Sequence, residues 1–554
     1  MSRVDEQART APRWSLVAIE IALIWGLMWA HAGWLPPDVN EPNYLGKAKH
    51  FWQPEWCARD FFLQTADAHH VFYWTFGWLT RWWSLDTVAY VGRALTYLLL
   101  ACAWWRLSWS LVPRRAAAVL SAALMLAATA RLHMAGEWVV GGLEAKAPAY
   151  AFVWLALAEM VRGAWRRVWP LVGIASAWHV VVGFWTGVGA AVVWVFARLA
   201  ARNEGDGPEV PSLGKMGPAI LLGLLLASPS LYGMLLLNRI ATADEVAQAA
   251  EIQVFTRIPH HLDPYKFFVA EETPPYLSMF GLRHVGLIAL WAVLAVWGSP
   301  SAGLKRLNLF VLAMVALVAI GLGIRWLWGP FVLDDPRRAA LLLRLYWFRM
   351  SDVVVPVGAA LAVTHTIFSW EPSRPELARW SAALLFGLAL AHFAVSIDRW
   401  VTYPYPLADA KTIGRRASVA EQRHRNWRAV CEEVRTRAPA GAVFLTPPYS
   451  QTFKWYAERA EVVTWKEMPQ DARSVIEWWD RFREIYRHDG RRTVSLAHSD
   501  EEKILQLAAL YGADFLLTEA NPSLRLPLWY HNDSFAIYDV NRSDDDRAQQ
   551  RGSP

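Results

Sequence analysis

The sequence "WSLVAIEIALIWGLMWAHAGWL" (residues 14–35) is followed directly by "PPDVNEPNYLGKAKHF" (residues 36–51). The first stretch is mostly apolar and long enough to cross a bilayer as a helix. The second stretch holds two acids, two lysines and a histidine. This order indicates a chain that crosses a membrane and then forms a charged segment at the membrane surface.

The composition extends this interpretation to the whole chain. Of the 554 residues, 55% are hydrophobic and 34 are Trp, and the mean hydropathy is +0.17. Trp is enriched at membrane interfaces, where its ring is half buried and its N–H reaches water. The net charge is +6. The Lys and Arg residues fall mostly between apolar runs, as topology signals do, so no nucleic-acid partner is expected.

Apolar runs predict about eleven transmembrane helices. The stretch 169–200 is too long for one upright helix, so we expect two short helices that meet near Val181. The short aromatic stretch 69–83 is expected to lie along the outer surface. The other spans are predicted near residues 14–35, 88–112, 115–134, 148–164, 217–238, 283–298, 308–328, 351–370 and 379–397.

Basic residues predict the orientation of these spans. With residues 1–13 in the cytoplasm, Lys and Arg fall repeatedly on the inner side, as the positive-inside rule requires. An odd number of spans then places the C-terminus outside. The transmembrane domain is predicted over residues 14–398, and the expected location is the inner (plasma) membrane of a bacterium, within its lipid bilayer. The outer loops are predicted at residues 36–87, 135–147, 239–282 and 329–350.

The last part of the chain has a different composition. Helix-like stretches at 419–437, 471–488 and 500–512 alternate with strand-like runs such as "AVFLTPP" and "SFAIYDV". This alternation predicts a small extracytoplasmic α/β domain over residues 399–543. Residues 544–554 are polar and are expected to form a disordered tail.

The charged segment after the first span contains the first candidate site. Asp38 and Glu41 are three residues apart and would face the same way on a helical turn, and Tyr44 and Lys47 continue that face. A carboxylate at the membrane surface can act as a general base or bind a metal ion. The alternative is that these acids are only solvated loop residues.

The residues "NEPNYLGKA" (40–48) resemble the acid–acid–Pro–x–Tyr motif at the end of the first span in GT-C glycosyltransferases. That superfamily includes protein O-mannosyltransferases, lipid A aminoarabinose transferases and the oligosaccharyltransferase catalytic subunit. The phrases "NEPNYLGKAKHFWQPEWCARDFF", "ADAHHVFYWTFGWLTRW" and "GGLEAKAPAYAFVWLAL" also resemble a group of bacterial membrane proteins with a domain of unknown function. The resemblance implies a GT-C-like fold of about eleven transmembrane helices with an outer C-terminal domain.

Asn40 departs from the superfamily motif, because the resemblance places its leading Asp at this position. An amide cannot act as a base. The resemblance therefore implies that Glu41 or Asp38 is the catalytic residue, with Asn40, Tyr44 and Lys47 as substrate-binding residues. The alternative is a branch that has lost transferase activity.

The second outer loop, "GEWVVGGLEAKAP" (136–148), supplies further candidates. Oligosaccharyltransferase-like enzymes have an acidic site in this loop, and Glu144 matches it by position. Lys146 lies close by, and Gly141 and Gly142 would let the backbone approach other groups closely. A glycine turn with a Glu/Lys pair at the interface is the alternative.

Two later segments add histidines and arginines. His260 and His261 lie in "FTRIPHHLDPYKF" (255–267) and could contact a metal ion or a sugar. Arg344 and Arg349 lie on the predicted outer side, against the positive-inside trend. Arg binds phosphate through two parallel hydrogen bonds, so both arginines are candidates for holding a lipid phosphate. Snorkelling of these side chains to the interface is the alternative.

Together these features predict an enzyme that moves a sugar from a polyprenyl-phosphate donor to an extracytoplasmic glycan, lipid or protein. The residues do not predict a definite cofactor, although their carboxylates could bind a divalent cation (Mg²⁺ or Mn²⁺). One alternative is a transporter or flippase, which would explain Glu20 and His179 within predicted spans. The other is a catalytically inactive GT-C-like scaffold.

Overall fold

The computed structural model describes residues 13–204, 210–237, 239–270, 276–277, 279–298, 300–403, 405–414, 417–487 and 493–541. The predicted tail at 544–554 and all of the predicted cytoplasmic segment except Arg13 lie outside these residues.

Long helices occupy the positions of all eleven predicted spans. Eight of them are long and apolar enough to cross a membrane in the described part of the chain, which fits a multi-pass membrane protein. The shorter ones are α7, α8 and α9, so the exact number of spans stays a prediction. The eleven helices are α2 (Trp14–Ala32), α6 (Leu85–Leu111), α7 (Ala117–Arg131), α8 (Lys146–Val161), α9 (Trp165–Trp178), α10 (Val180–Glu204), α11 (Leu213–Leu237), α15 (Met279–Trp297), α16 (Ala302–Trp328), α18 (Arg349–Trp370) and α19 (Pro375–Thr402).

The break predicted within residues 169–200 is confirmed. His179 separates α9 from α10 and has an extended backbone, with φ −151° and ψ 104°. Its Nδ1 atom accepts a hydrogen bond from the backbone N–H of Val182 at 3.4 Å, at the start of α10. His179 therefore acts as a cap between two helices. Glu20 is also held structurally, because it accepts hydrogen bonds from Trp105 Nε1 and from the N–H of Ala116 before α7.

The segments predicted as outer loops, which keep that name below, contain only short elements. The stretch 69–83 forms two short helical pieces and no spanning helix, as the sequence predicts. These elements are α3 (Glu41–Trp52), α4 (Phe61–Gln64), α5 (His70–Trp74), η1 (Gly77–Arg81), α12 (Ala243–Glu251), the π-helical turn η2 (Ile252–Arg257), α13 (Pro259–Leu262), α14 (Tyr265–Phe268), β1 (Val269–Ala270), β2 (Tyr276–Leu277) and α17 (Pro336–Leu343).

The C-terminal part folds around a five-stranded mixed sheet in the order β4–β3–β5–β7–β6. Strand β3 is parallel to β4 and β5, and β7 is antiparallel to β5 and β6. Strands β3, β5 and β7 coincide with strand-like runs of the sequence, β4 overlaps such a run (residues 461–465) only at Glu461, and β6 was not predicted. The elements are η3 (Leu407–Asp409), α20 (Ala410–Ile413), α21 (Ala417–Arg437), β3 (Val443–Leu445), α22 (Phe453–Ala457), β4 (Ala460–Glu461), α23 (Ala472–Tyr486), η4 (Leu496–His498), α24 (Glu501–Tyr511), β5 (Phe515–Glu519), β6 (Leu528–His531) and β7 (Phe535–Asp539).

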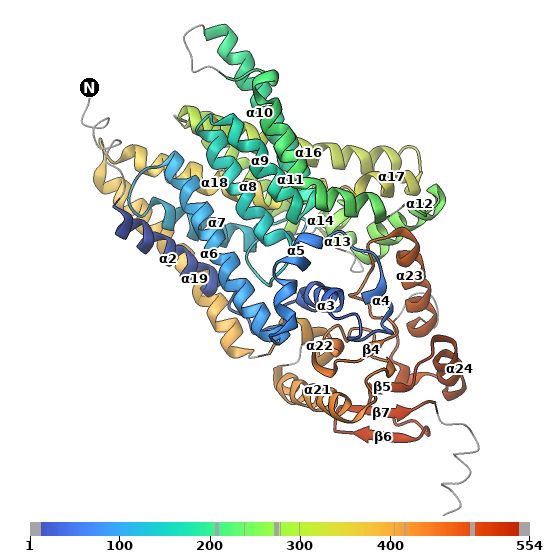
Figure 1. Ribbon diagram of the computed structural model, residues 1–554. Helices are drawn as coiled ribbons and strands as arrows, with labels where there is room; N and C mark the ends of the chain where they lie inside the picture. Colours follow the sequence, from blue (N-terminus) through green and yellow to red (C-terminus); the bar gives the residue numbers. More distant parts are fainter. Residues whose placement is uncertain are drawn as a thin grey trace, which may run out of the picture.

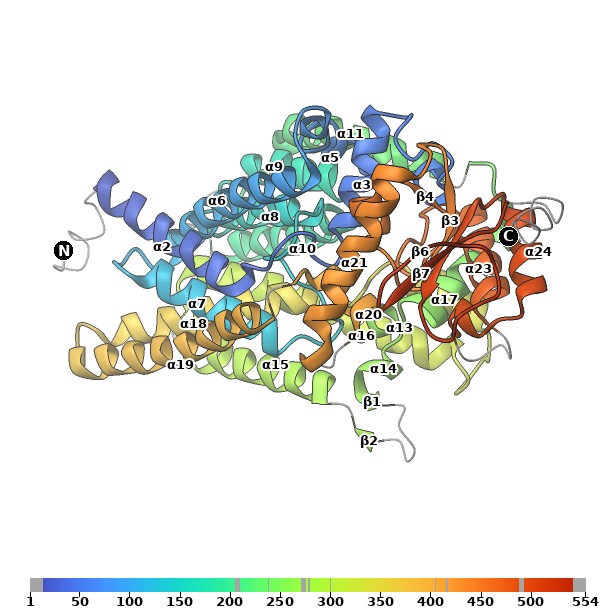
Figure 2. The same ribbon diagram turned by 90° about the horizontal axis from the view of Figure 1, so that it is seen from below.

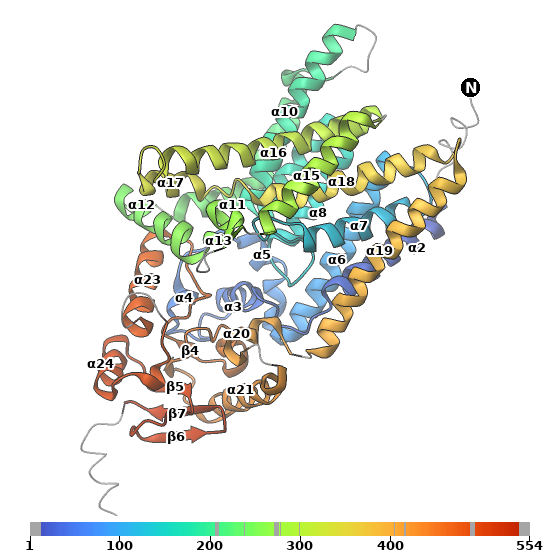
Figure 3. The same cartoon turned by 180° about the vertical axis from the view of Figure 1, so that it is seen from behind.

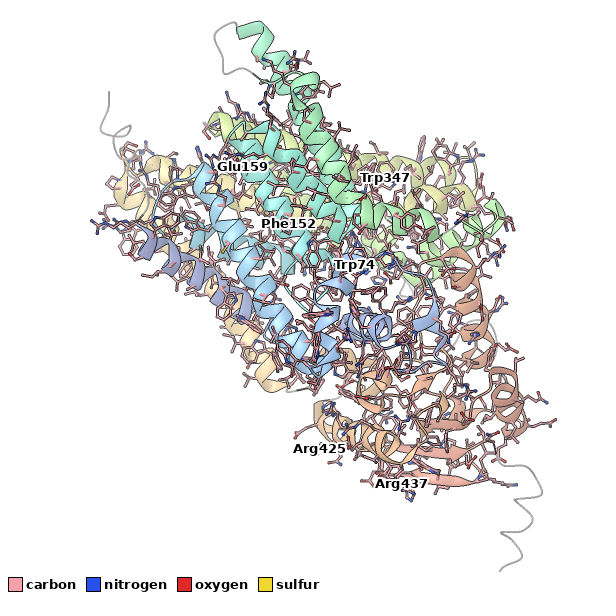
Figure 4. The ribbon with its side chains drawn as sticks, viewed as in Figure 1. Trp74, Phe152, Glu159, Trp347, Arg425 and Arg437 are labelled. Atoms are coloured by element: carbon pink, nitrogen blue, oxygen red, sulfur yellow. The ribbon has the colours of Figure 1, made fainter. Side chains whose placement is uncertain are left out.

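The long helices and the sheet occupy different ends of the molecule (Figure 1). The first outer loop, with α3, α4 and α5, lies between them. Figure 2 shows that α2 begins at the end remote from the sheet, and Figure 3 shows α2, α6 and α19 side by side from behind. In Figure 4, Glu159 lies in the helical part, away from Arg425 and Arg437 on α21. Glu159 forms ion pairs with Arg162 and Arg167, which the sequence places on the inner side, and with Arg106 of the predicted span 88–112.

A buried charge cluster fastens the C-terminal part to the first outer loop. Lys454 Nζ lies 3.1 Å from Asp60 Oδ2 and 2.7 Å from Glu461 Oε1, and it also contacts Glu467. Asp60 accepts a hydrogen bond from the N–H of Glu461 at 3.0 Å. Burial raises the pKa of Glu467, which favours the protonated form of this carboxyl and lowers the excess of negative charge.

We expect Lys454→Met to lower the stability of the protein by about 3–5 kcal/mol, because it leaves buried carboxylates without their cation. Thermal unfolding of the full-length protein in detergent measures this change. Lys305→Met, at an exposed position on α16, is the control. Equal midpoints for the two variants would contradict this role of Lys454.

Candidate functional site

A buried ion pair positions the first outer loop against the helices. Arg93, about two turns into α6, donates to Glu41 Oε1 from Nε at 2.6 Å and to Oε2 from Nη2 at 2.5 Å. Both side chains are fully buried. Glu41 is the first residue of α3, so this pair fixes where α3 begins relative to the membrane helices.

Glu41 has no lone pair left for chemistry. Oε1 also accepts the N–H of Leu143 at 2.6 Å, and Oε2 accepts the N–H of Asp38 at 2.7 Å. Each carboxylate oxygen therefore has two donors, which saturates it. This geometry gives Glu41 a structural role, because its side chain joins both outer loops to α6, and its role as a base stays a prediction.

We expect Glu41→Gln to destabilise the fold by about 3–5 kcal/mol, because the buried guanidinium of Arg93 loses its counter-charge. The thermal midpoint of the full-length protein measures the effect. Glu376→Gln, at an exposed position on α19, is the matched control. A stable Glu41→Gln protein that loses only activity would restore Glu41 as a catalytic candidate.

Asp38 is placed differently from Glu41. Its side chain is 5% exposed and lines a cavity of about 300 Å³. Burial raises the pKa of Asp38, and the nearby charge of Arg93 opposes this rise. A raised pKa makes the ionised carboxylate a stronger base. A Cβ atom on Gly142 would lie 2.7 Å from the Cβ of Asp38, so only glycine permits this close approach of the second loop. The structure thus favours Asp38 of the two predicted catalytic acids.

A chain of charged groups links the first and second outer loops to α18. Asn40 Nδ2 donates to Glu144 Oε1 at 2.6 Å. Lys146 Nζ lies 3.5 Å from Glu144 and 3.6 Å from Glu137, and Arg349 Nε lies 3.3 Å from the same oxygen of Glu137. Burial raises the pKa of Glu144, opposed by Lys146 and by the hydrogen bond from Asn40. The predicted residues Asn40, Glu144, Lys146 and Arg349 therefore lie in one cluster.

The second loop is held in place from α18. Asp352, one turn after Arg349, is fully buried and accepts the backbone N–H groups of Met134, Ala135 and Glu137 at 2.7–3.1 Å. Three N–H donors on one carboxylate fix this part of the loop. The same helix therefore fixes the loop and supplies the arginine that pairs with its acid.

The arrangement around Lys146 does not fit a divalent cation. A metal ion would need several oxygen or nitrogen ligands around one point. Lys146 already lies between the carboxylates of Glu137 and Glu144, where such an ion would bind, and Asn40 replaces the acid of the motif. Among the described residues, no three His, Cys, Asp or Glu side chains are grouped to hold a metal ion.

Of the predicted residues on α3, Lys47 lies apart from this cluster and Tyr44 lies at its edge. Lys47 is directed toward a cavity of about 330 Å³, where its Nζ donates to Thr65 and lies 3.9 Å from Asp67. The structure therefore does not bring Lys47 to Glu144. Tyr44 packs against His69 and is within electrostatic reach of Glu144 and Arg349, so it borders the cluster.

The predicted histidines lie near a second group of cations. The rings of His260 and His261 are 4.0 Å apart, and His261 hydrogen-bonds the carbonyl of Ala135. This carbonyl is in the second outer loop, so the two loops touch. Arg344 is partly buried at the end of α17, and no ion pair joins it to a carboxylate in the described part of the chain.

Sequence reasoning missed Arg257 and Lys466. Arg257 is 8% exposed, packs over Trp465 and donates to the carbonyl oxygen of Lys466, and its Nε is buried without a hydrogen-bond partner. Burial, then repulsion from Arg257, lowers the pKa of Lys466 to about 7. Neither cation has an ion pair with a carboxylate among the described residues. Arg257 lies within the stretch 255–267, and Lys466 directly follows the strand-like run at residues 461–465. Neither position by itself indicates that the two cations lie together.

We expect anion binding at Arg257 and Lys466 to weaken as the pH rises through about 7, because Lys466 then loses its proton. Inorganic sulfate is the probe, since its own charge is constant over this range. Its Kd should increase about tenfold between pH 6 and pH 8.5, as expected for one hydrogen bond from a charged group. Lys466→Arg should remove the dependence, and an unchanged slope in that variant would count against the assignment.

Comparisons with known proteins find a family model and solved structures that are similar to this chain. A family model described as a domain of unknown function (DUF6798) matches residues 425–485, from α21 to α23. No curated protein matches the chain. The crystal structure of the apo oligosaccharyltransferase from Archaeoglobus fulgidus is similar over 91% of this chain and 69% of that one, with 10% identity and a TM-score of 0.42. A similarity this low carries no conclusion about activity.

Proposed function

We propose that this protein is a membrane glycosyltransferase that moves a sugar from a polyprenyl-phosphate donor to an acceptor at the outer membrane surface. The observation that carries the proposal is a buried carboxylate that lines a cavity and is close in sequence to a cluster of buried cations. Asp38 supplies the carboxylate. It is two residues from Asn40, which hydrogen-bonds Glu144 in the cluster that holds Lys146 and Arg349. The resemblance of residues 40–48 to the GT-C motif supports the same reaction class.

Each group has a role that its environment suits. Asp38 accepts the proton of the acceptor hydroxyl, and the acceptor oxygen forms a bond to the anomeric carbon of the sugar. The bond between that carbon and the phosphate oxygen breaks, and the polyprenyl phosphate leaves. Arg349 and Lys146 stabilise the negative charge that develops on the phosphate. Attack opposite the leaving phosphate inverts the anomeric centre.

Glu137 and Glu144 orient the cations in this scheme. Each carboxylate holds Lys146 at about the same distance, and Glu137 also holds Arg349. Cations held by buried acids need no rearrangement when charge appears on the phosphate. The step written here uses no metal ion, in keeping with the position of Lys146.

The residues that raised the alternatives have structural partners. Glu20 and His179 each accept a hydrogen bond from a backbone N–H near the start of a helix, so a structural role accounts for both. Asn40 hydrogen-bonds Glu144, so its amide contributes to the cluster although it cannot act as a base. In this proposal the reaction does not need an Asp at position 40.

The test is a titration of the detergent-solubilised protein with polyprenyl phosphate and with a panel of polyprenyl-phosphate sugars. Arg349→Gln should weaken binding about tenfold or more, as for the loss of a charge-assisted hydrogen bond. Asp38→Asn should bind the donor like the parent protein but should no longer release polyprenyl phosphate from it. Arg338→Gln, at an exposed position on α17, is the control. If no polyprenyl lipid binds the parent protein, the proposal fails.

A further inference from the structure

A cavity of about 300 Å³ lies where the outer ends of α2, α7 and α19 meet the second outer loop. Its volume is at the lower end of the range for small-molecule sites. Asp38 is its buried acid, and Arg131 and Arg399 are its cations. The other lining residues are His31, Ala32, Trp34, Val39, Ala130, Trp138, Val140, Gly141, His392, Ser396 and Leu407.

The two arginines are placed where membrane proteins have few cations. Arg131 is in the last turn of α7 and Arg399 is in the last turn of α19, both at the predicted outer ends. Both are exposed, and neither forms an ion pair with a carboxylate in the described residues. They also lie at the ends of neighbouring helices that reach the cavity from two sides.

Two histidines also line the cavity. His31 Nδ1 and His392 Nε2 are 3.0 Å apart, so one ring donates to the other. Nδ1 of His392 is buried and has no hydrogen-bond partner among the described residues. A polar nitrogen left in this state fits a ligand that brings an acceptor atom or a bound water.

Exposed apolar side chains are close in sequence to residues that line the cavity. Leu35 follows Trp34 at 43% exposure, and Val395 and Val401 flank Arg399 on α19 at 42% and 61% exposure. Helices α2 and α19 pack side by side (Figure 3). The site thus combines cations and an apolar edge at the membrane surface, which is the arrangement that suits a lipid with an anionic headgroup.

We propose that this cavity binds the phosphate of an anionic lipid that enters from the outer leaflet and serves as the acceptor. Arg131 and Arg399 hold the phosphate, and the acyl chains lie along α2 and α19. A hydroxyl group on the headgroup then reaches Asp38, which takes its proton as the sugar is transferred. The role as acceptor rests on the proposed function, whereas lipid binding does not.

The cavity is separate from the cations assigned to the donor. Lys146 and Arg349 do not line it. Trp138 connects the two sites, because it lines the cavity while Lys146 Nζ packs over its ring at 3.9 Å. Donor and acceptor phosphates would therefore occupy different cations, with Asp38 at the boundary.

The experiment measures binding of dioctanoyl phosphatidylglycerol to the full-length protein in an uncharged detergent. This lipid has a phosphate and a headgroup hydroxyl. Arg131→Gln/Arg399→Gln should weaken its binding more than tenfold, because each arginine contributes a charge-assisted hydrogen bond. Arg131→Lys/Arg399→Lys should retain much of the affinity. Arg374→Gln/Arg379→Gln, at the other end of α19, should bind like the parent protein.

Three ligand controls identify what the cavity recognises. Dioctanoyl phosphatidylcholine, which has no net charge, should bind much more weakly, and inorganic phosphate and glycerol phosphate should not compete at the same concentration. Competition by the two chain-free phosphates would show a small-anion site and overturn the assignment to a lipid. Unchanged lipid binding in the Arg131→Gln/Arg399→Gln protein would overturn the site itself, provided its thermal midpoint matches that of the Lys variant.

The same variants separate this inference from the proposed function. Polyprenyl phosphate should bind normally to the Arg131→Gln/Arg399→Gln protein and weakly to Arg349→Gln, while phosphatidylglycerol should show the reverse. Loss of both ligands in one variant would show a single shared site and would overturn the separate acceptor site. If phosphatidylglycerol binds but no polyprenyl lipid does, the lipid site stands and the glycosyltransferase proposal fails.

Discussion

The ion pair between Glu41 and Arg93 is the constraint on which the outer surface depends. It lies on the path from the membrane helices to both outer loops, since Glu41 also receives the N–H groups of Asp38 and Leu143. A buried pair of this kind contributes little net stability over a well-packed apolar pair, because both ions lose their hydration. The pair instead fixes the position of α3, because only one position lets Glu41 accept all four hydrogen bonds.

This register has a direct consequence for the neighbouring residues. With α3 fixed, Asn40 reaches Glu144, and Asp38 is turned toward the cavity at the ends of α2, α7 and α19. Adjacent acids in one short segment thereby acquire different roles. Glu41 is saturated and structural, whereas Asp38 retains contact with a space that a substrate can enter.

Charged residues on the predicted outer side form two kinds of cluster. Around Lys146, acids and cations alternate and balance one another. Around Arg257 and Lys466, and again around Arg131 and Arg399, the described residues supply no carboxylate partner. Positive groups without counter-charges at a membrane surface favour anionic ligands. The proposed acceptor phosphate uses the unpaired cations Arg131 and Arg399, whereas the proposed donor phosphate uses Lys146 and Arg349, which buried acids hold in place.

The sequence by itself determined the helical architecture and the elements of the C-terminal part. Apolar length and the aromatic character of residues 69–83 depend only on local composition, so the eleven long helices and the break at His179 were predictable. Strand β6, with its partly exposed pattern, was not predicted, and neither were the two-residue strands β1 and β2. The tertiary structure decided which charged residues act together. Arg93 is 52 positions from Glu41, and Arg349 belongs to a different helix from Glu137. Periodicity along one segment placed Lys47 with Glu41, yet packing directs it to Asp67 instead. Hydrogen-bond saturation depends on such distant partners, and for this reason no local pattern could distinguish Glu41 from Asp38.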